Sequence, residues 1–146
     1  HHTAPINNLY ALHEALVMLE EEGLDAAESR HLQTQKALVA GLEAMGLTMA
    51  VAPQYRLPQL NSVLIPQGVD DAALRTALLN EFDLEIGAGL GALAGKTWRI
   101  GLMGFASNAR NVVYCLTALE AILQRQGAAI NSGKALAAAR AVFDGQ

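Results

Sequence analysis

Arg99 is the residue whose type and position are best suited to ligand chemistry. It lies in the predicted strand 97–103, which reads TWRIGLM. Alternate residues of a strand share one face, so Arg99 lies between Thr97 and Gly101, opposite the apolar residues of the strand. These small neighbours leave space over the guanidinium, whose planar fork of N–H donors suits a carboxylate held by two parallel hydrogen bonds. The alternative is a structural ion pair, for which Glu85 on the preceding predicted strand is the obvious partner.

The glycine-rich segment 87–92, GAGLGA, precedes this strand and resembles two phosphate-binding motifs without satisfying either. A P-loop requires G-x-x-x-x-G-K-[ST]; residues 95–97 fit its end, but the first glycine should stand at Leu90. The segment also fits the loose dinucleotide pattern G-x-G-x-x-A, yet a strand follows it where both motifs need a helix N-terminus. We therefore interpret it as a flexible connection, or as a loop that lets a ligand approach closely.

No metal site or catalytic nucleophile is predicted. The histidines have no pair at i, i+4, and the single Cys115 lies among apolar helical residues, which indicates burial rather than reactivity. None of the three lysines lies in an apolar pattern that would activate it for Schiff-base chemistry. Asp70-Asp71 is better interpreted as a helix cap than as a pair of catalytic acids.

The composition of the chain argues against several classes of function. The 146 residues suit one domain, and 52% hydrophobic against 16% charged residues indicates a substantial core. A net charge of −4 without a Lys/Arg run argues against nucleic-acid binding, and no apolar run is long enough for a membrane span. The N-terminus does not resemble a secretory signal, and one cysteine suits a reducing compartment, so we expect a cytoplasmic location.

Hydrophobic periodicity and capping residues predict the elements that position Arg99. Helices are expected from the N-terminus to Glu22, over 25–45, after a cap at Asp70, after a cap at Ser107 or Asn108, and in the Ala-rich tail. Strands are expected at 47–51, 60–66, 84–86 and 97–103. The order α-α-β-β-α-β-β-α favours an α/β chain, α+β within this segment, with a small antiparallel or mixed sheet covered on one face by helices.

The first helix is apolar on several sides. Its stripe consists of Leu9, Leu12, Leu16 and Leu19, with Val17 and Met18 beside it. A helix that is apolar on several sides needs packing partners on two of them. We therefore predict that 1–23 bridges to a second domain or subunit, that 24–127 forms a small α/β domain, and that 128–146 is a tail helix.

Three segments together resemble the C-terminal part of class V aminotransferases, fold-type I enzymes that use pyridoxal phosphate. They are the opening HHTAP, the glycine segment IGAGLG and the strand WRIGLMG. The similarity runs from His1 to about Leu123 and is greatest to the alanine–glyoxylate and serine–glyoxylate (serine–pyruvate) branch.

The resemblance implies a role for two residues. Arg99 falls on the arginine that binds the α-carboxylate of the amino- or keto-acid substrate. Thr3 falls on a threonine that contacts the cofactor phosphate in the neighbouring subunit of a homodimer. The family's cofactor lysine, and the aspartate that pairs with the pyridinium nitrogen, lie upstream. The chain is therefore expected to be a piece that is inactive alone; the alternatives are a stand-alone carboxylate-binding module and an oligomerisation domain.

Overall fold

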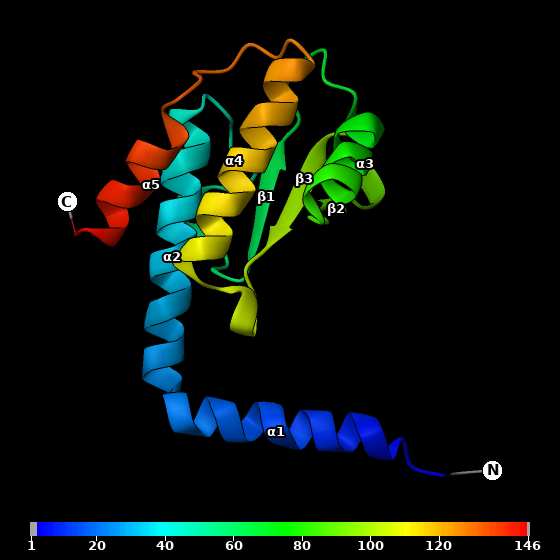
Figure 1. Cartoon of the computed structure of the whole chain (residues 1–146), viewed down its shortest axis with the longest axis vertical. Coiled ribbons are helices and arrows are strands. Elements are labelled where there is room, and N and C mark those ends of the chain that lie inside the picture. Colours follow the sequence, from blue (N-terminus) through cyan, green and yellow to red (C-terminus); the bar gives the residue numbers. More distant parts are fainter. Residues whose placement is uncertain (1–2, 146) are drawn as a thin grey trace.

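The computed structural model describes residues 3–145 and shows five helices beside a small sheet (Figure 1). The helices are α1 (Ile6–Glu22), α2 (Leu24–Ala44), α3 (Asp71–Phe82), α4 (Ala109–Arg125) and α5 (Ala135–Phe143), and the strands are β1 (Leu60–Leu64), β2 (Gly87–Ala88) and β3 (Thr97–Gly101). The sheet has the order β1-β3-β2, and both pairings are antiparallel. The predicted fold class is confirmed.

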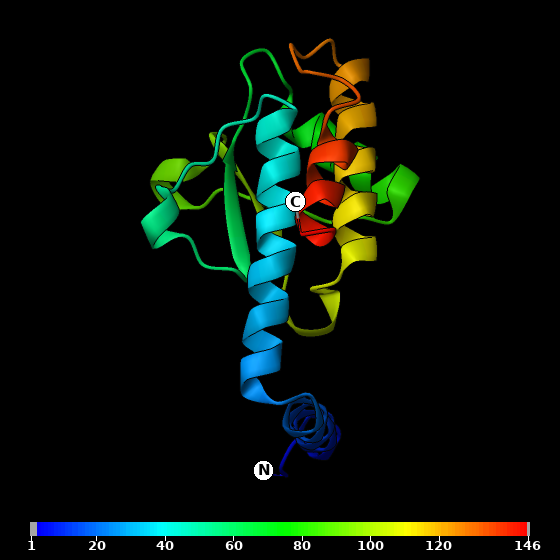
Figure 2. The same ribbon diagram turned by 90° about the vertical axis from the view of Figure 1, so that its left-hand side faces the viewer.

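Helices α2, α4 and α5 form a layer on one side of the sheet (Figures 1 and 2). The central strand β3 turns Trp98 and Ile100 toward that layer, and the next core position is Leu102; these side chains are 0%, 4% and 3% exposed. The predicted alternation is correct for these residues, but Thr97, which the sequence predicts beside Arg99 on the open face, is only 1% exposed and lies against Gly89. Arg99 and Gly101 lie on the opposite, open face of β3.

Local sequence signals set where α3 and α4 begin. The Asp70 carboxylate caps α3 by accepting a hydrogen bond from the Ala73 N–H at 3.0 Å. Asn108 caps α4 in the same way, accepting from the Asn111 N–H at 2.9 Å. Side-chain oxygens at these positions satisfy donors that the helix cannot pair internally, so both predicted caps are confirmed.

The predicted strand 84–86 is wrong, because the strand lies further on, at β2. Asp83 ends α3 in the left-handed conformation with φ 48°, and the Leu84 N–H still donates to Leu78 O at 3.1 Å. The backbone there belongs to the helix cap and is not available to a sheet. Pairing begins only where Gly87 meets Arg99.

The predicted strand 47–51 is also not a full strand. It reduces to one isolated antiparallel bridge between Met49 and Val63. Two backbone hydrogen bonds flank this bridge, and a short 3-10 turn that begins at Pro53 follows. Proline lacks an N–H and cannot continue a ladder, so the pairing ends early.

Helix α1 ends before Gly23, as predicted, but differs from the other helices in having no buried residue. It joins the N-terminal end of α2 at a sharp bend and lies apart from the sheet (Figures 1 and 2). Most of its stripe remains exposed within residues 3–145, with Leu9 at 50% and both Leu12 and Leu16 at 56%, whereas Leu19 is half-buried. In contrast, α5 packs on α2 and buries Ala135 and Ala139 completely.

Candidate functional site

Arg99 lies at the centre of the sheet, paired with Ser62 of β1 on one side and Gly87 of β2 on the other. Its side chain is partly exposed on the open face. The Nε–H donates to the carbonyl oxygen of Ala88 at 2.8 Å. This bond holds the guanidinium against β2 and leaves its two terminal nitrogens without an acceptor among residues 3–145.

Gly87 provides the surface on which the guanidinium rests. A Cβ built there would lie 3.2 Å from Nη2 of Arg99 and 3.4 Å from Cζ. A side chain at position 87 would therefore require the guanidinium to shift by a few tenths of an ångström. The glycine segment does allow a close approach, and the approaching group is Arg99 itself.

Glu85 is not the partner of Arg99. The Glu85 side chain is exposed, and across residues 3–145 Arg99 forms no ion pair. Its terminal nitrogens find no acceptor within that stretch either. A partly buried guanidinium with a free fork suits an external anion, and the fork geometry favours a carboxylate.

Gly89 serves the turn rather than a ligand. It is buried, and a Cβ there would collide with the carbonyl oxygen of Leu93 and lie 2.6 Å from Thr97 Oγ1. A short 3-10 turn (Gly91–Leu93) then leads into β3, with the Gly89 N–H donating to Thr97 O at 2.8 Å. Neither phosphate motif is formed, because a strand and not the N-terminus of an α-helix follows this turn.

The buried side of β3 is anchored beside Arg99. The Trp98 indole N–H donates to Asp71 Oδ1 at 2.9 Å, and Arg75 Nε donates to the same oxygen at 2.8 Å. The Arg75 guanidinium, together with the indole donor, holds the pKa of Asp71 below its ordinary value. This anchor ties α3 to the central strand and fixes the backbone that carries Arg99.

Thr3 lies apart from Arg99. It is exposed and precedes α1, which carries the N-terminal end away from the sheet (Figure 1). A single exposed hydroxyl does not form a phosphate site, and all three lysines, at positions 36, 96 and 134, are exposed. The residues described here therefore fit a carboxylate and do not by themselves fit pyridoxal phosphate. His1 and His2, part of the opening motif, lie outside the described residues.

Cys115 is buried at 6% exposure, and burial raises the pKa of its thiol to about 12. The predicted burial is confirmed, and a thiol with this pKa is a poor nucleophile. Over residues 3–145, no group of three or more His, Cys, Asp or Glu side chains could hold a metal ion. No helix in the same stretch is both long and apolar enough to span a membrane.

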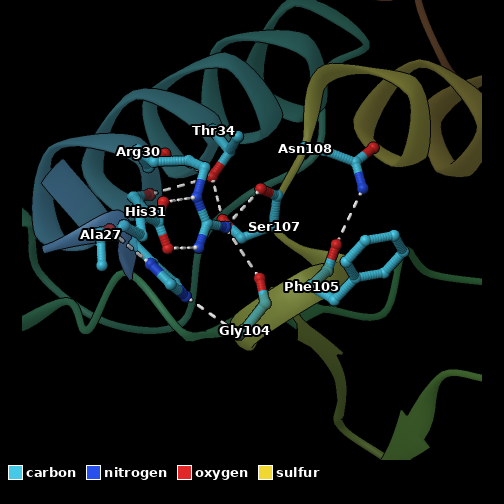
Figure 3. A network of polar contacts seen from close by, with 9 residues as sticks. Ala27, Arg30, His31, Thr34, Gly104, Phe105, Ser107 and Asn108 are labelled. Carbon is cyan, nitrogen blue, oxygen red and sulfur yellow. Dashed lines mark hydrogen bonds and ion pairs between the residues drawn. The ribbon is translucent and has the colours of Figure 1, made fainter. Parts of the chain in front are cut away.

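Sequence analysis missed a polar cluster that joins α2 to the loop after β3 (Figure 3). Arg30 binds the carboxylate of Glu22 through Nε and Nη2, and His31 contacts Gly104. The cluster lines a cavity of about 680 Å³ between α1, α2 and residues 104–108. More than 70 residues separate its two halves in the sequence, so no local pattern predicts it.

The chain is similar in sequence to known transaminases. No protein-family model matches the chain. It is 43% identical over 144 residues to the (S)-ureidoglycine–glyoxylate transaminase of Bacillus subtilis (strain 168), covering 99% of this chain and 35% of that protein. It is 37% identical over 126 residues to the alanine–glyoxylate aminotransferase of Felis catus, covering 86% of this chain and 30% of that protein. The chain thus spans about a third of the length of the curated relatives it matches.

Solved structures show the same relationship. The ureidoglycine–glyoxylate aminotransferase from Bacillus subtilis superposes with a TM-score of 0.94 over 98% of this chain and 37% of its own. The pyridoxamine–pyruvate aminotransferase from Mesorhizobium loti is 34% identical. It superposes with a TM-score of 0.93 over 99% of this chain and 37% of its own. By sequence and by fold, the chain is homologous to the C-terminal part of the class V aminotransferases.

Proposed function

We propose that this chain is the C-terminal part of a pyridoxal-phosphate-dependent aminotransferase that moves an amino group from alanine or serine to glyoxylate or pyruvate. Glyoxylate appears in the names of the Bacillus subtilis and Felis catus relatives, and pyruvate in that of the Mesorhizobium loti structure. All of these acceptors are small 2-oxo acids. Their common recognition element is a carboxylate next to the reacting carbon.

The observation that supports this proposal most directly is the guanidinium of Arg99. Its Nε is bound to Ala88, and its terminal nitrogens have no acceptor within residues 3–145. Each charge-assisted hydrogen bond to a substrate carboxylate contributes roughly 1.5–3 kcal/mol. A carboxylate fixed by two such bonds has a defined orientation, so Arg99 would direct the α-carbon of the substrate toward the reacting groups.

The cofactor would be held chiefly by residues outside this chain. Pyridoxal phosphate, when bound, supplies the electron sink that lets the substrate lose its α-hydrogen. The three lysines of the chain are exposed, so we propose that the cofactor lysine lies elsewhere in the intact protein and that this segment alone is inactive. Thr3 would add one hydroxyl to a phosphate site built by other residues.

Helix α1 would provide the connection to those residues. Its apolar side chains are exposed, with Tyr10 at 73% and Leu12 at 56%. Exposed apolar surface of this extent on a helix indicates an interface. We propose that residues 1–23 bridge from the small domain (24–127, followed by the tail 128–146) to the rest of the enzyme. In that arrangement Thr3 reaches the active site of the second subunit of a cytoplasmic homodimer.

The experiment that tests the proposal compares the intact protein with the isolated 146-residue chain. The intact protein should show the visible absorption of bound pyridoxal phosphate and convert alanine plus glyoxylate into pyruvate plus glycine. The isolated chain should be colourless and inactive. An intact protein without bound cofactor and without turnover would instead support the carboxylate-binding or oligomerisation alternative.

A further inference from the structure

The short turn between β3 and α4 has an unusually well-anchored backbone (Figure 3). Each carbonyl oxygen from residue 104 to residue 107 accepts a hydrogen bond from a side chain of α2 or of the start of α4. The donors are Arg30 (to Gly104 and Ser107, each at 2.8 Å), Asn108 (to Phe105 at 2.9 Å) and Asn111 (to Ala106 at 3.0 Å). Side chains from two helices therefore hold all four residues of the turn.

Helix α2 adds two further contacts at the ends of this turn. His31 is buried, and its Nε2 accepts a hydrogen bond from the Gly104 N–H at 3.0 Å. Since Nε2 is the acceptor, the ring proton lies on Nδ1, which donates to Ala27 O at 2.6 Å. At the other end, Thr34 Oγ1 lies 2.5 Å from Ser107 Oγ. The position of the turn is thus fixed relative to α2.

The side chain that this rigid turn carries outward is Phe105. It is 86% exposed, the highest value of any large apolar side chain among residues 3–145. Its ring points away from the polar cluster (Figure 3). An aromatic residue on an ordered backbone is typical of an interface anchor, because little backbone freedom is left to lose when a partner covers the ring.

Phe105 borders the cavity of about 680 Å³ between α1, α2 and the turn. The wall that α1 contributes consists of Ala15, Met18 and Leu19, and Met18 is 50% exposed. This wall is continuous with the exposed apolar stripe of α1. Apolar surface therefore extends from Phe105 across the cavity onto the helix that would connect the small domain to the rest of the enzyme.

The polar side chains around this cavity all have partners within residues 3–145. Arg30 binds the carboxylate of Glu22 through two nitrogens. His31, Ser107 and Asn108 are engaged with α2, the turn and the first turn of α4. A small-molecule site needs a few polar groups that are available to orient the ligand. Because these groups are already paired with one another, the cavity suits an apolar protein surface better than a small polar ligand.

We propose that Phe105 anchors an interface with the upstream part of the same polypeptide, a step that rests on the proposal that this chain is the C-terminal part of a longer enzyme. The chain covers 35% and 30% of two curated relatives, so most of such an enzyme lies outside it. The upstream part would join the chain just before α1, which forms one wall of the cavity. A covalently linked segment has a much higher effective concentration than a second copy, and this favours it as the occupant.

Photo-crosslinking of the purified intact protein tests the occupant directly. The photoreactive amino acid p-benzoylphenylalanine replaces Phe105, and in a matched control it replaces Tyr55, which is 75% exposed and does not line the cavity. After irradiation, mass spectrometry should find position 105 joined to a peptide that precedes this chain, in a band with the mass of one subunit. Position 55 should not form this product.

Two results of this experiment overturn the proposal. A crosslinked band with the mass of two subunits would assign Phe105 to a contact between two copies of the protein. No product at position 105, or equal yields at positions 105 and 55, would mean that the upstream part does not cover Phe105.

Phe105→Ser gives an independent measurement, because an exposed ring adds to stability only if another part of the protein covers it. In the intact protein it should lower Tm by about 3–6 °C, whereas Tyr55→Ser should change Tm by less than about 1 °C. Equal changes in Tm would overturn the anchor. Turnover of alanine with glyoxylate is measured in parallel on the wild type. A crosslink at position 105 without turnover refutes the proposed function alone, and turnover without the crosslink refutes the interface alone.

Discussion

Arg99 and Gly87 face each other across β3 and β2, and the guanidinium of the first rests on the backbone of the second. A Cβ at Gly87 would lie 3.2 Å from Nη2 of Arg99, which is the flexible end of a long side chain. We therefore expect Gly87→Ala to displace the guanidinium without disrupting the fold. KM for glyoxylate should rise about tenfold while Tm changes by no more than about 2 °C. A variant with normal KM would show that the guanidinium does not need this surface.

Gly89→Ala should have the opposite effect. Its new methyl group would meet backbone, the carbonyl oxygen of Leu93, rather than a flexible side chain. Overpacking of this kind costs about 1–3 kcal/mol, so the free energy of unfolding should fall by that amount. Denaturant titration measures it, with Gly87→Ala as the matched control. Equal free energies of unfolding for Gly87→Ala and Gly89→Ala would contradict the claim that only position 89 is closed off by backbone.

Asp71 should make stability depend on pH in acid. Hydrogen bonds from Arg75 and Trp98 lower the pKa of Asp71 in the folded state. Because the pKa of Asp71 is lower in the folded than in the unfolded state, the charged carboxylate stabilises the fold at any pH above its unfolded-state pKa. This stabilisation is lost as the pH falls through the folded-state pKa. Asp71→Asn should thus cost about 1–2 kcal/mol at pH 6 and progressively less below about pH 4. Denaturant unfolding of both proteins at several pH values measures this difference. A pH-independent difference would exclude the charge as its source.

Asp83 should be replaceable with a gain in stability. It occupies the left-handed conformation, with φ 48°, at the C-terminal end of α3. A side chain there is strained, and a negative charge opposes the helix dipole. Asp83→Gly should raise the free energy of unfolding by about 0.5–1 kcal/mol, and the stability of Asp83→Asn should lie between those of the wild type and Asp83→Gly. A loss of stability in both variants would mean that the carboxylate has a compensating partner.

Much of the scaffold follows from local sequence signals. The alternation around Trp98 and Arg99 predicts which face of β3 is buried, and Asp70 and Asn108 predict where α3 and α4 begin. These signals suffice because each depends on neighbours within four residues.

The remaining features depend on contacts between distant parts of the chain. Strand β2 forms at Gly87 instead of Leu84, because the end of α3 retains the backbone of Leu84. The Gly104 N–H finds its acceptor on His31, 73 residues earlier in the chain. The glycine at position 87 is also explained by a contact between different strands, because the Arg99 side chain lies where a Cβ of residue 87 would make a tight contact.

The central claim is that Arg99 binds the carboxylate of an aminotransferase substrate, and Arg99→Lys tests it most directly. Lysine keeps the charge but loses the planar fork and the Nε contact to Ala88. The measurement is kcat/KM of the intact protein for alanine and glyoxylate, beside Arg140→Lys, an exposed control on α5. We predict a fall of about 10- to 100-fold at position 99, mainly through KM, and none at position 140. Wild-type kcat/KM in the Arg99→Lys enzyme would contradict the claim.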